Sequence, residues 1–317
     1  MCRLFGFRSN VPSRTHRSLV EAENALAVQA LEHSDGWGIG YFMGNEAYIL
    51  KSDTGAAKDK RFQKITSRLQ SHAFVVHVRR ATVGNVDSLN SHPFRYGSWV
   101  FAHNGTIFGF DQMRDEIMKD VAEPLQQPIF GDTDSEHLFY LLLSALEDAG
   151  IASDGRGEID VHVATEVLRN ALSSLYRIAK RDGHPPPILN FILTNGKVFF
   201  AQRAGLELYV ATQKFNCRDF EICTEVNKSC MDIADPISTL LEEAPPTAPV
   251  RTVNHCLVAS EPISEEDQWE EIPEGNLLVM NERMELFVSP APEDFQKCPH
   301  PPAPAPRPPW VNTQPVV

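Results

Sequence analysis

The sequence contains no run of apolar residues that approaches the roughly 20 needed to span a lipid bilayer. The apolar part of its first residues, Met1 to Phe7, is too short for a secretory signal peptide. Basic residues are fewer than acidic ones, 29 against 42, which gives a net charge of −13. We therefore expect a cytoplasmic protein that has neither a nucleic-acid-binding nor a membrane-binding surface.

The six cysteines lie at positions 2, 217, 223, 230, 256 and 298, and no two of them form a C-x-x-C pair. A zinc ribbon or a thioredoxin-type redox motif is therefore not indicated. No histidine pair has the H-E-x-x-H spacing of a metal site, and we interpret most histidines as structural hydrogen-bonding residues, with His103 bracing a turn (His33, His77, His92, His103 and His137). We expect free thiols, no metal and no cofactor.

Apolar patterns divide the chain into clusters of strands and helices rather than repeating β-α-β units. Leu19 to Leu31 has apolar residues at helical spacing and predicts one buried helix; Phe62 to Leu69, Ser135 to Leu146 and Val163 to Ala179 predict three more. Strands are predicted at residues 2–8, 38–42, 47–50, 73–78, 98–102, 188–193, 198–201, 208–211, 257–259, 277–280 and 286–288. This order favours an α+β protein with packed antiparallel sheets.

The C-terminal segment differs in composition from the rest of the chain. Ten of the 23 prolines fall within residues 289–317, and proline cannot donate a sheet hydrogen bond. We therefore divide the chain into a folded domain, residues 2–288, and a Pro-rich disordered tail, residues 289–317. The P-x-x-P spacings of the tail are compatible with a polyproline-binding partner, although an inert tail is the simpler interpretation.

The residue after the initiator methionine is a cysteine. Methionine aminopeptidases remove Met1 when the next residue is small, and Cys2 would then carry a thiol and a free α-amine. The ordinary pKa is about 7.7–8.0 for the amine and about 8.5 for the thiol, so one residue supplies both a base and a nucleophile. A cysteine at position 2 also occurs by chance, so this signal needs support from the rest of the chain.

Four polar segments, SDGWGIG, HVRRATVG, HNG and GDTDSE, lie at the ends of expected strands or helices, where functional sites collect. Each has a structural alternative. The three glycines of the first follow a helix and open a strand, the reverse of a dinucleotide-binding loop. Arg79 directly follows a buried apolar run and needs an anion, which an internal ion pair would supply. Asp134 has the alternative of a helix cap, and Asn104-Gly105 is ordinarily a turn.

Taken together, these segments resemble those of the class II glutamine amidotransferases. The resemblance rests on six motifs in the family's order, MCRLFG, SDGWGIGYF, HVRRATVG, SHPF, FAHNG and GDTDSEHL. It covers roughly residues 2 to 290. More narrowly, the chain is similar to stand-alone members without a fused synthase domain, which include γ-glutamyl amidases of ergothioneine and glutathione metabolism.

The resemblance implies a four-layer αββα N-terminal-nucleophile hydrolase fold, with two antiparallel sheets between helices. It also implies the site residues. Cys2 corresponds to the nucleophile, and Asn104 and Gly105 correspond to the oxyanion hole. The substrate-binding residues correspond to Arg79 for the α-carboxylate, Thr82 for the glutamine pocket and Asp134 for the α-ammonium.

The activity implied is hydrolysis of the γ-glutamyl amide of glutamine or of a γ-glutamyl conjugate through a Cys2 thioester. Water is the final acceptor, or ammonia passes to a separate ammonia-accepting or peptidase subunit. The sequence departs from many synthase-linked members at Arg80 and Val83, where those have Trp and His, so the leaving group stays open. Two rival hypotheses are a non-catalytic binding subunit that uses the Pro-rich tail and a Cys-first hydrolase of bile-salt or penicillin-like amides.

Overall fold

A computed structural model describes residues 2–30, 36–79, 89–215, 249–293, 295 and 297. Its strands are β1 (Arg3–Ser13), β2 (Trp37–Met43), β3 (Glu46–Ser52), β4 (Ser71–Val78), β5 (Phe94–Tyr96), β6 (Trp99–Thr106), β7 (Ile188–Thr194), β8 (Phe199–Gln202), β9 (Tyr209–Lys214), β10 (Arg251–Thr252), β11 (His255–Ala259), β12 (Asp267–Glu271), β13 (Leu277–Met280) and β14 (Glu285–Ser289). Its helices are the π-helical turn η1 (Arg17–Glu21), α1 (Leu26–Gln29), α2 (Lys60–Thr66), α3 (Phe110–Lys119), α4 (Glu123–Gln126), α5 (Asp134–Asp148) and α6 (Val161–Arg181).

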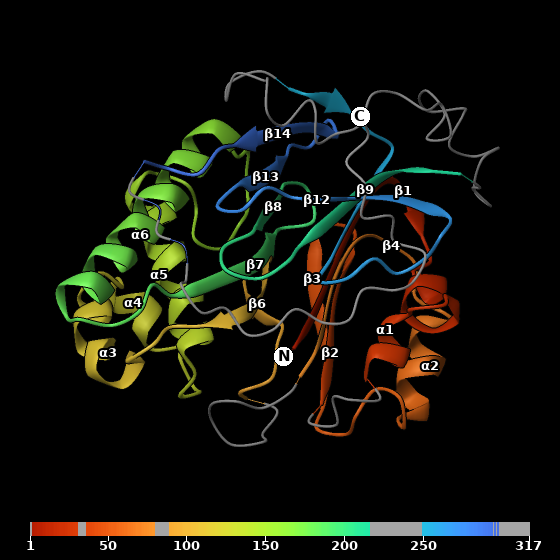
Figure 1. The fold of residues 1–317 in the computed structure, drawn as a ribbon, viewed down its shortest axis with the longest axis horizontal. Coiled ribbons are helices and arrows are strands. Elements are labelled where there is room, and N and C mark those ends of the chain that lie inside the picture. Colours follow the sequence, from red (N-terminus) through yellow and green to blue (C-terminus); the bar gives the residue numbers. More distant parts are fainter. Residues whose placement is uncertain are drawn as a thin grey trace.

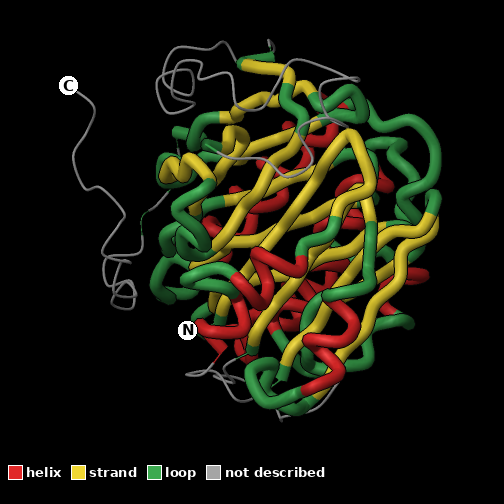
Figure 2. Tube along the Cα trace, turned by 90° about the vertical axis from the view of Figure 1, so that its right-hand side faces the viewer, coloured by secondary structure: helices red, strands yellow, loops and turns green. Residues whose placement is uncertain are grey.

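Two seven-stranded antiparallel sheets lie face to face between two layers of helices (Figure 1). The first sheet has the strand order β12-β9-β11-β1-β4-β2-β3, and the second has the order β10-β14-β13-β8-β7-β6-β5. Helices α3 to α6 cover the outer face of the second sheet, and η1, α1 and α2 cover that of the first. Seen from the side of α1 and α2, the strands run obliquely behind these short helices (Figure 2). The α+β, four-layer αββα prediction is confirmed.

Strand β1 shows how the alternation of side chains builds these layers. Leu4 points into the space between the sheets, where it belongs to the same core as Val100 of the second sheet. Phe5 and Phe7 point the other way and pack with Leu19 under the short helices. Because successive side chains of a strand face opposite sides, β1 contributes to two separate cores.

The single buried helix predicted at Leu19–Leu31 is wrong in its extent. The structure has η1 and α1 instead, and Ala22 between them adopts an extended conformation with ψ 160°. The helical periodicity of the apolar residues has a real cause, since Leu19 and Leu26 are both buried against the same sheet. Two short helical pieces satisfy that pattern as well as one long helix, so periodicity alone did not decide between them.

The structure adds elements that the apolar pattern did not predict, namely β5, β10, β12, α3 and α4. Beyond β14, Phe295 contacts Tyr176 of α6, with ring centroids 5.7 Å apart. Residues 298–317 lie outside the described residues, so the boundary at 288 and the disordered tail at 289–317 stay predictions.

Candidate active site

Cys2 lies directly before β1, the central strand of the first sheet, and its half-buried side chain is a thiol. The Leu4 N–H donates to Ser260 Oγ at 3.0 Å and holds the beginning of the strand. From the facing sheet, Asn104 Nδ2 donates to the Cys2 carbonyl oxygen at 3.0 Å. Two residues more than 100 positions apart in the sequence are therefore in direct contact, as the sequence-based site requires.

Arg79 follows β4, which pairs with β1 so that Val78 is opposite Arg3. This register places Arg79 at the same end of the sheet as Cys2. The Arg79 N–H donates to the Gly36 carbonyl oxygen at 2.9 Å, and the residue is 4% exposed. Gly36 has φ +124°, a conformation that favours glycine. The first glycine of the SDGWGIG motif therefore helps to position an arginine.

The turn predicted at His103-Asn104-Gly105 is wrong, because β6 continues through these residues to Thr106. Pairing with β7, which lies far along the chain, keeps the backbone extended there. A Cβ atom on Gly105 would lie 1.9 Å from the Ile188 oxygen and 2.3 Å from His103 Nε2. Close approach of a neighbouring strand, and not a turn, therefore excludes a side chain at position 105.

Asp134 is the first residue of α5, and the N-cap of that helix is Thr133, whose hydroxyl accepts from the Glu136 N–H at 3.3 Å. The interpretation of Asp134 as only the cap is therefore wrong. Its Oδ2 accepts from the Ile107 N–H at 2.8 Å, and its Oδ1 accepts from the Ser135 hydroxyl at 3.2 Å. The carboxylate is buried at 5% exposure, at a helix N-terminus that favours negative charge.

No cation of the described residues lies within ion-pairing distance of the Asp134 carboxylate. Ionised carboxyl groups have about four acceptor positions, and two hydrogen bonds leave capacity for a further donor. A buried charge without a counter-charge is unfavourable unless a ligand supplies one. Asp134 is therefore suited to hold a positively charged group of a ligand.

One pocket brings most of the sequence-predicted site together. Its lining comprises Cys2, His77, Arg79, Asn90, His92, His103, Gly105, Thr133, Asp134 and Ser135, around a cavity of about 40 Å³. Asn104 joins the site through its hydrogen bond to Cys2 rather than as a lining residue. Thr82 lies outside the described residues, so its role stays a prediction.

His92 belongs to this pocket and is an exception to the interpretation of most histidines as structural hydrogen-bonding residues. Neither ring nitrogen has a hydrogen-bond partner among the described residues, although the side chain is 7% exposed. Its ring lies 4.3 Å from that of His77, centroid to centroid. Burial, followed by the neighbouring His77, lowers the pKa of His92 well below its ordinary value, so the imidazole is neutral. The SHPF motif contained this residue, but no local pattern indicated that its ring lacks partners.

His103 braces an extended strand, not the turn that the sequence suggested. Its Nε2 donates to the Ile188 carbonyl oxygen at 3.0 Å, and its Nδ1 lies 2.9 Å from Ser135 Oγ. Burial lowers the pKa of His103, although nearby Asp134 opposes the shift. In the neutral ring, Nδ1 is an acceptor, so the single Ser135 hydroxyl proton is shared between His103 and Asp134. The oxyanion-hole strand and the acid at the start of α5 are thereby linked. His137 is also structural, since its Nδ1 donates to the Thr133 carbonyl at 2.8 Å.

Among the described residues, no cluster of three or more His, Cys, Asp or Glu side chains has the arrangement of a metal site. Within the same part of the chain, no helix has the length and apolar character needed to cross a membrane.

Residues 1–302 match the sequence profile of the class II glutamine amidotransferases. The chain belongs to this family. A probable glutamine amidotransferase of Saccharomyces cerevisiae is 24% identical over 325 residues, which cover 94% of this chain and 87% of that protein. A putative glutamine amidotransferase of Haemophilus influenzae is 30% identical over 206 residues, 63% of this chain and 62% of that protein.

A shorter match has a more specific name. A gamma-glutamyl-hercynylcysteine sulfoxide hydrolase of Mycobacterium tuberculosis is 36% identical over 78 residues, which cover 24% of this chain and 34% of that protein. The resemblance to stand-alone family members, including γ-glutamyl amidases, is thereby confirmed.

Solved structures of the family share the fold. A glutamine aminotransferase class-II domain protein from Silicibacter pomeroyi superposes with a TM-score of 0.58 at 19% identity, over 92% of this chain and all of that one. The glutamine phosphoribosylpyrophosphate amidotransferase of B. subtilis superposes with a TM-score of 0.56 at 16% identity, over 93% of this chain and 50% of that one. The expected N-terminal-nucleophile hydrolase fold is therefore confirmed.

Proposed function

We propose that this amidotransferase-family protein hydrolyses the γ-glutamyl amide of glutamine or of a γ-glutamyl conjugate, with Cys2 as the nucleophile. The observation that carries the proposal is the presence of two buried, oppositely charged side chains, Arg79 and Asp134, in the lining of one pocket with the Cys2 thiol. A γ-glutamyl group carries a carboxylate and an ammonium on its α-carbon, so two charges of opposite sign match it.

In this proposal the α-carboxylate binds Arg79, whose planar guanidinium can donate to two oxygens at once. The α-ammonium donates to Asp134, which has acceptor capacity left after its bonds to the Ile107 N–H and the Ser135 hydroxyl. Together these contacts would hold the γ-carbonyl carbon near the Cys2 sulfur, and such positioning lowers the activation barrier. Bile-salt and penicillin-like amides have no α-ammonium, so Asp134 supports an amino-acid substrate instead.

The reaction would proceed in two steps. The α-amine of Cys2, free once Met1 is removed, takes the thiol proton, and the sulfur attacks the γ-carbonyl carbon. The oxyanion accepts hydrogen bonds from Asn104 Nδ2 and the Gly105 N–H. The amine then protonates the leaving nitrogen, the C–N bond breaks and a γ-glutamyl thioester remains. Water attacks the thioester, which releases glutamate and restores the thiol.

Asn104 Nδ2 has two protons, and one of them already bonds the Cys2 carbonyl. The second has only a long contact with Ser260 Oγ, at 3.4 Å. This proton is therefore the one that we assign to the oxyanion. The cavity of about 40 Å³ is smaller than a typical ligand pocket of roughly 300 Å³ or more, so the proposal requires the lining side chains to move when substrate enters.

Water is the acceptor that we propose, and the hydrolase named among the relatives supports this choice. Transfer of ammonia to a separate ammonia-accepting or peptidase subunit stays a prediction. A measurement of free ammonia or amine distinguishes hydrolysis from transfer. If the isolated chain hydrolyses its substrate, it releases ammonia or amine in an amount equal to glutamate.

The test uses the full chain with Met1 removed, incubated with glutamine and with a panel of γ-glutamyl amides, with glutamate as the measured product. A mass spectrum of acid-quenched enzyme should show a γ-glutamyl adduct on Cys2. Cys256→Ala is the matched control, because burial raises the pKa of that thiol to about 12 and makes it inert. Unchanged turnover in Cys2→Ala, or full activity with Met1 retained, would contradict the mechanism.

A further inference from the structure

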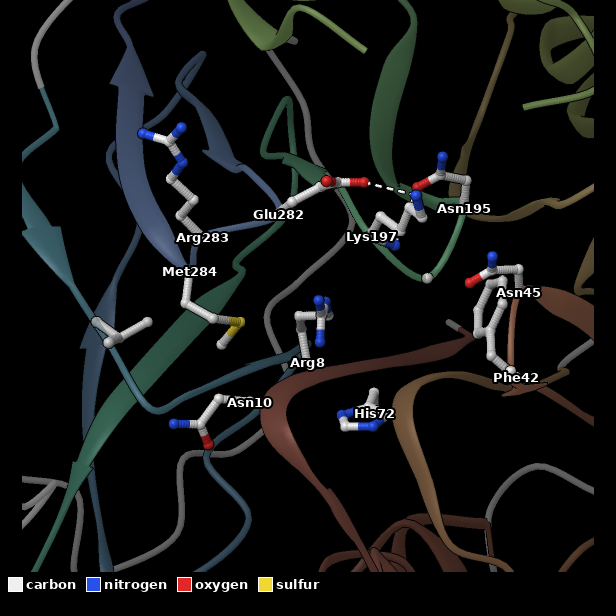
Figure 3. A pocket seen from close by; sticks show the side chains of 13 residues that line it. Arg8, Asn10, Phe42, Asn45, His72, Asn195, Lys197, Glu282, Arg283 and Met284 are labelled. Carbon is white, nitrogen blue, oxygen red and sulfur yellow. Dashed lines mark hydrogen bonds and ion pairs between the residues drawn. The ribbon is translucent and has the colours of Figure 1, made fainter. Parts of the chain in front are cut away.

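A second and larger cavity lies at the other end of β1. Its volume is about 450 Å³, and none of its lining residues belongs to the pocket around Cys2. The β2–β3, β7–β8 and β13–β14 turns surround it, together with Arg8 and Asn10 from β1 (Figure 3). About six residues of extended strand separate Cys2 from Arg8, which corresponds to roughly 20 Å. The cavity is therefore distinct from the candidate active site.

Arg8 points into the space between the two sheets, where apolar side chains otherwise predominate. A Cβ on Gly6 would meet Ile192 and Phe199 of the second sheet, so Gly6 faces that sheet. Arg8 lies two residues further along the strand and therefore faces the same way. Its cross-strand neighbour Cys256 belongs to the core between the sheets. The Arg8 guanidinium group therefore lies at the open end of the core between the two sheets.

The protein satisfies this guanidinium only in part. Arg8 is 7% exposed, and its Nη1 donates to the Ser9 carbonyl oxygen. Its Nε is buried without a hydrogen-bond partner, and no carboxylate of the described residues lies within ion-pairing distance. Burial lowers the pKa of Arg8 to about 10, although Glu282 opposes the shift. Because a buried charge without a partner is strongly unfavourable, an anion at this position would stabilise the fold.

Other buried arginines show that this fold can satisfy the same group. Arg3 forms an ion pair with Glu261. Arg169 donates to Gln202 Oε1 at 3.0 Å and, from another nitrogen, to Ser289 Oγ at 3.1 Å, with further bonds to backbone carbonyls. Within the part of the chain that the structure describes, Arg8 has neither a carboxylate partner nor a side-chain acceptor, and its single hydrogen bond is to the Ser9 carbonyl oxygen.

The remaining charges of the cavity offset the charge of Arg8 only in part. The acidic lining residue, Glu282, is paired with Lys197 at 2.8 Å (Figure 3). Arg283 adds a third cation to the lining, although its side chain points away from the cavity centre, toward which Arg8 points (Figure 3). The lining therefore holds three cationic side chains and one anionic side chain, and Phe42 and Met284 supply apolar surface beside them.

We propose that this cavity is a second binding site, for a small molecule whose phosphate or carboxylate group pairs with the Arg8 guanidinium. A planar guanidinium matches both kinds of oxyanion through paired hydrogen bonds. The volume is within the range of small-molecule sites. Phe42 and Met284 would contact the less polar part of the ligand. The proposal does not depend on the chemistry assigned to Cys2.

The test compares the full-length chain with Arg8→Met and Arg8→Lys, and Arg283→Gln is the matched control. Inorganic phosphate and malonate are titrated separately by calorimetry, with sodium chloride at equal ionic strength to correct for screening. Arg8→Met should weaken binding about ten- to hundredfold, the loss expected for hydrogen bonds to a charged group. Arg8→Lys should weaken it less, and Arg283→Gln by no more than about threefold. A phosphate-only or malonate-only response identifies which oxyanion the site accepts.

Thermal unfolding supplies a second measurement that does not depend on the variants folding equally well. Phosphate should raise the Tm of the wild type above the chloride control, and this difference should vanish in Arg8→Met. Arg79→Met tests whether the anion binds beside Cys2 instead. Binding that survives Arg8→Met and is lost in Arg79→Met would overturn the proposal. So would the absence of any response of the wild type to both anions.

Discussion

The two ends of β1 hold two cavities of opposite character. Around Cys2 the space is about 40 Å³, and buried charges of both signs line it. Around Arg8 the space is about 450 Å³, and the lining is mainly cationic. Among the described residues, no cysteine, serine or threonine that could act as a nucleophile lines the larger cavity. The chemistry of the lining, and not the volume, therefore distinguishes a candidate catalytic pocket from a candidate binding cavity.

Preorganisation also differs between the two ends. At the Cys2 end, Asp134, Ser135, His103 and Ile188 form one continuous chain of hydrogen bonds. At the Arg8 end, the buried guanidinium has a single hydrogen bond, to a neighbouring carbonyl, among the described residues. Groups held by several partners suit a reaction that requires fixed geometry, whereas an incompletely satisfied charge suits reversible capture of an anion.

The largest expected effect is the loss of glutamate release in Cys2→Ala, by about 10⁴-fold or more, because no other described residue of the pocket can form the thioester. Arg8→Met should leave the rate of glutamate release within about threefold of the wild type. Assays of both variants on the same γ-glutamyl substrate measure the contrast. If the two variants lose activity equally, the division of β1 into two functional ends is wrong.

Asp134→Asn should reduce kcat/KM about 10²- to 10³-fold, since removal of one partner of a buried charge pair is worth about 2–5 kcal/mol. The substrate analogue that lacks the α-amino group separates recognition from folding, because wild type and variant should turn it over at similar low rates. Steady-state kinetics with both substrates measure this. An equal loss on both substrates would indicate that Asp134 acts only through Ile107 and Ser135.

Gly105→Ala should lower the free energy of unfolding by about 2–3 kcal/mol, because the new Cβ would overlap the Ile188 oxygen. Gly150→Ala is the control for backbone conformation alone: Gly150 has φ +81° and nothing within 4 Å of the added carbon, so we expect about 1 kcal/mol there. Urea unfolding measures both. Equal losses would show that close packing against β7 is not the constraint at position 105.

Acidification should destabilise the Cys2 end. Burial lowers the pKa of His92 well below its ordinary value, so below pH 6.5 the unfolded chain binds a proton that the folded chain does not. The stability from this residue is therefore complete above pH 6.5 and is lost as the pH falls, by about 1 kcal/mol between pH 6.5 and 5.5. His92→Phe should reduce that dependence. Calorimetry of the wild type and of His92→Phe across this pH range measures how the free energy of unfolding changes with pH. Identical slopes in the two proteins would contradict the expectation.

The smallest effect is expected for Lys197→Met, which breaks the ion pair between Lys197 and Glu282. Both side chains are more than two-fifths exposed, at 42% and 48%. Such pairs contribute less than about 1 kcal/mol, and the Tm should change by roughly 2 °C or less. Phosphate affinity should fall only a few-fold. A loss as large as that in Arg8→Met would move the centre of the proposed anion site from Arg8 to Lys197.

Local pattern predicted much of this protein. The alternating and periodic apolar residues located most of the strands and the two long helices, because burial of one face depends on spacing along a few residues. The ordered motifs of the sequence pointed to Cys2, Arg79, Asn104, Gly105 and Asp134. The described residues among the predicted set lie together, although their catalytic roles await the experiments above.

Other features depended on partners that are distant in the sequence. His103-Asn104-Gly105 has the composition of a turn, yet β7 pairs with it about 85 residues later and keeps it extended. In the sequence, His92 looks like any buried histidine. Only the structure shows that its ring nitrogens have no hydrogen-bond partner among the described residues.

Arg8 illustrates the same limit at the other end of the strand. The sequence placed it at the end of a predicted strand, but the facing sheet and the pairing with Cys256 showed which way it points, and the packed structure showed that no carboxylate of the described residues pairs with it. The sequence by itself determined most of the strands, the two long helices, the family and the residues available for chemistry. Only the tertiary structure decided which charges meet a partner, because that depends on how two sheets face each other, and no local pattern encodes that arrangement.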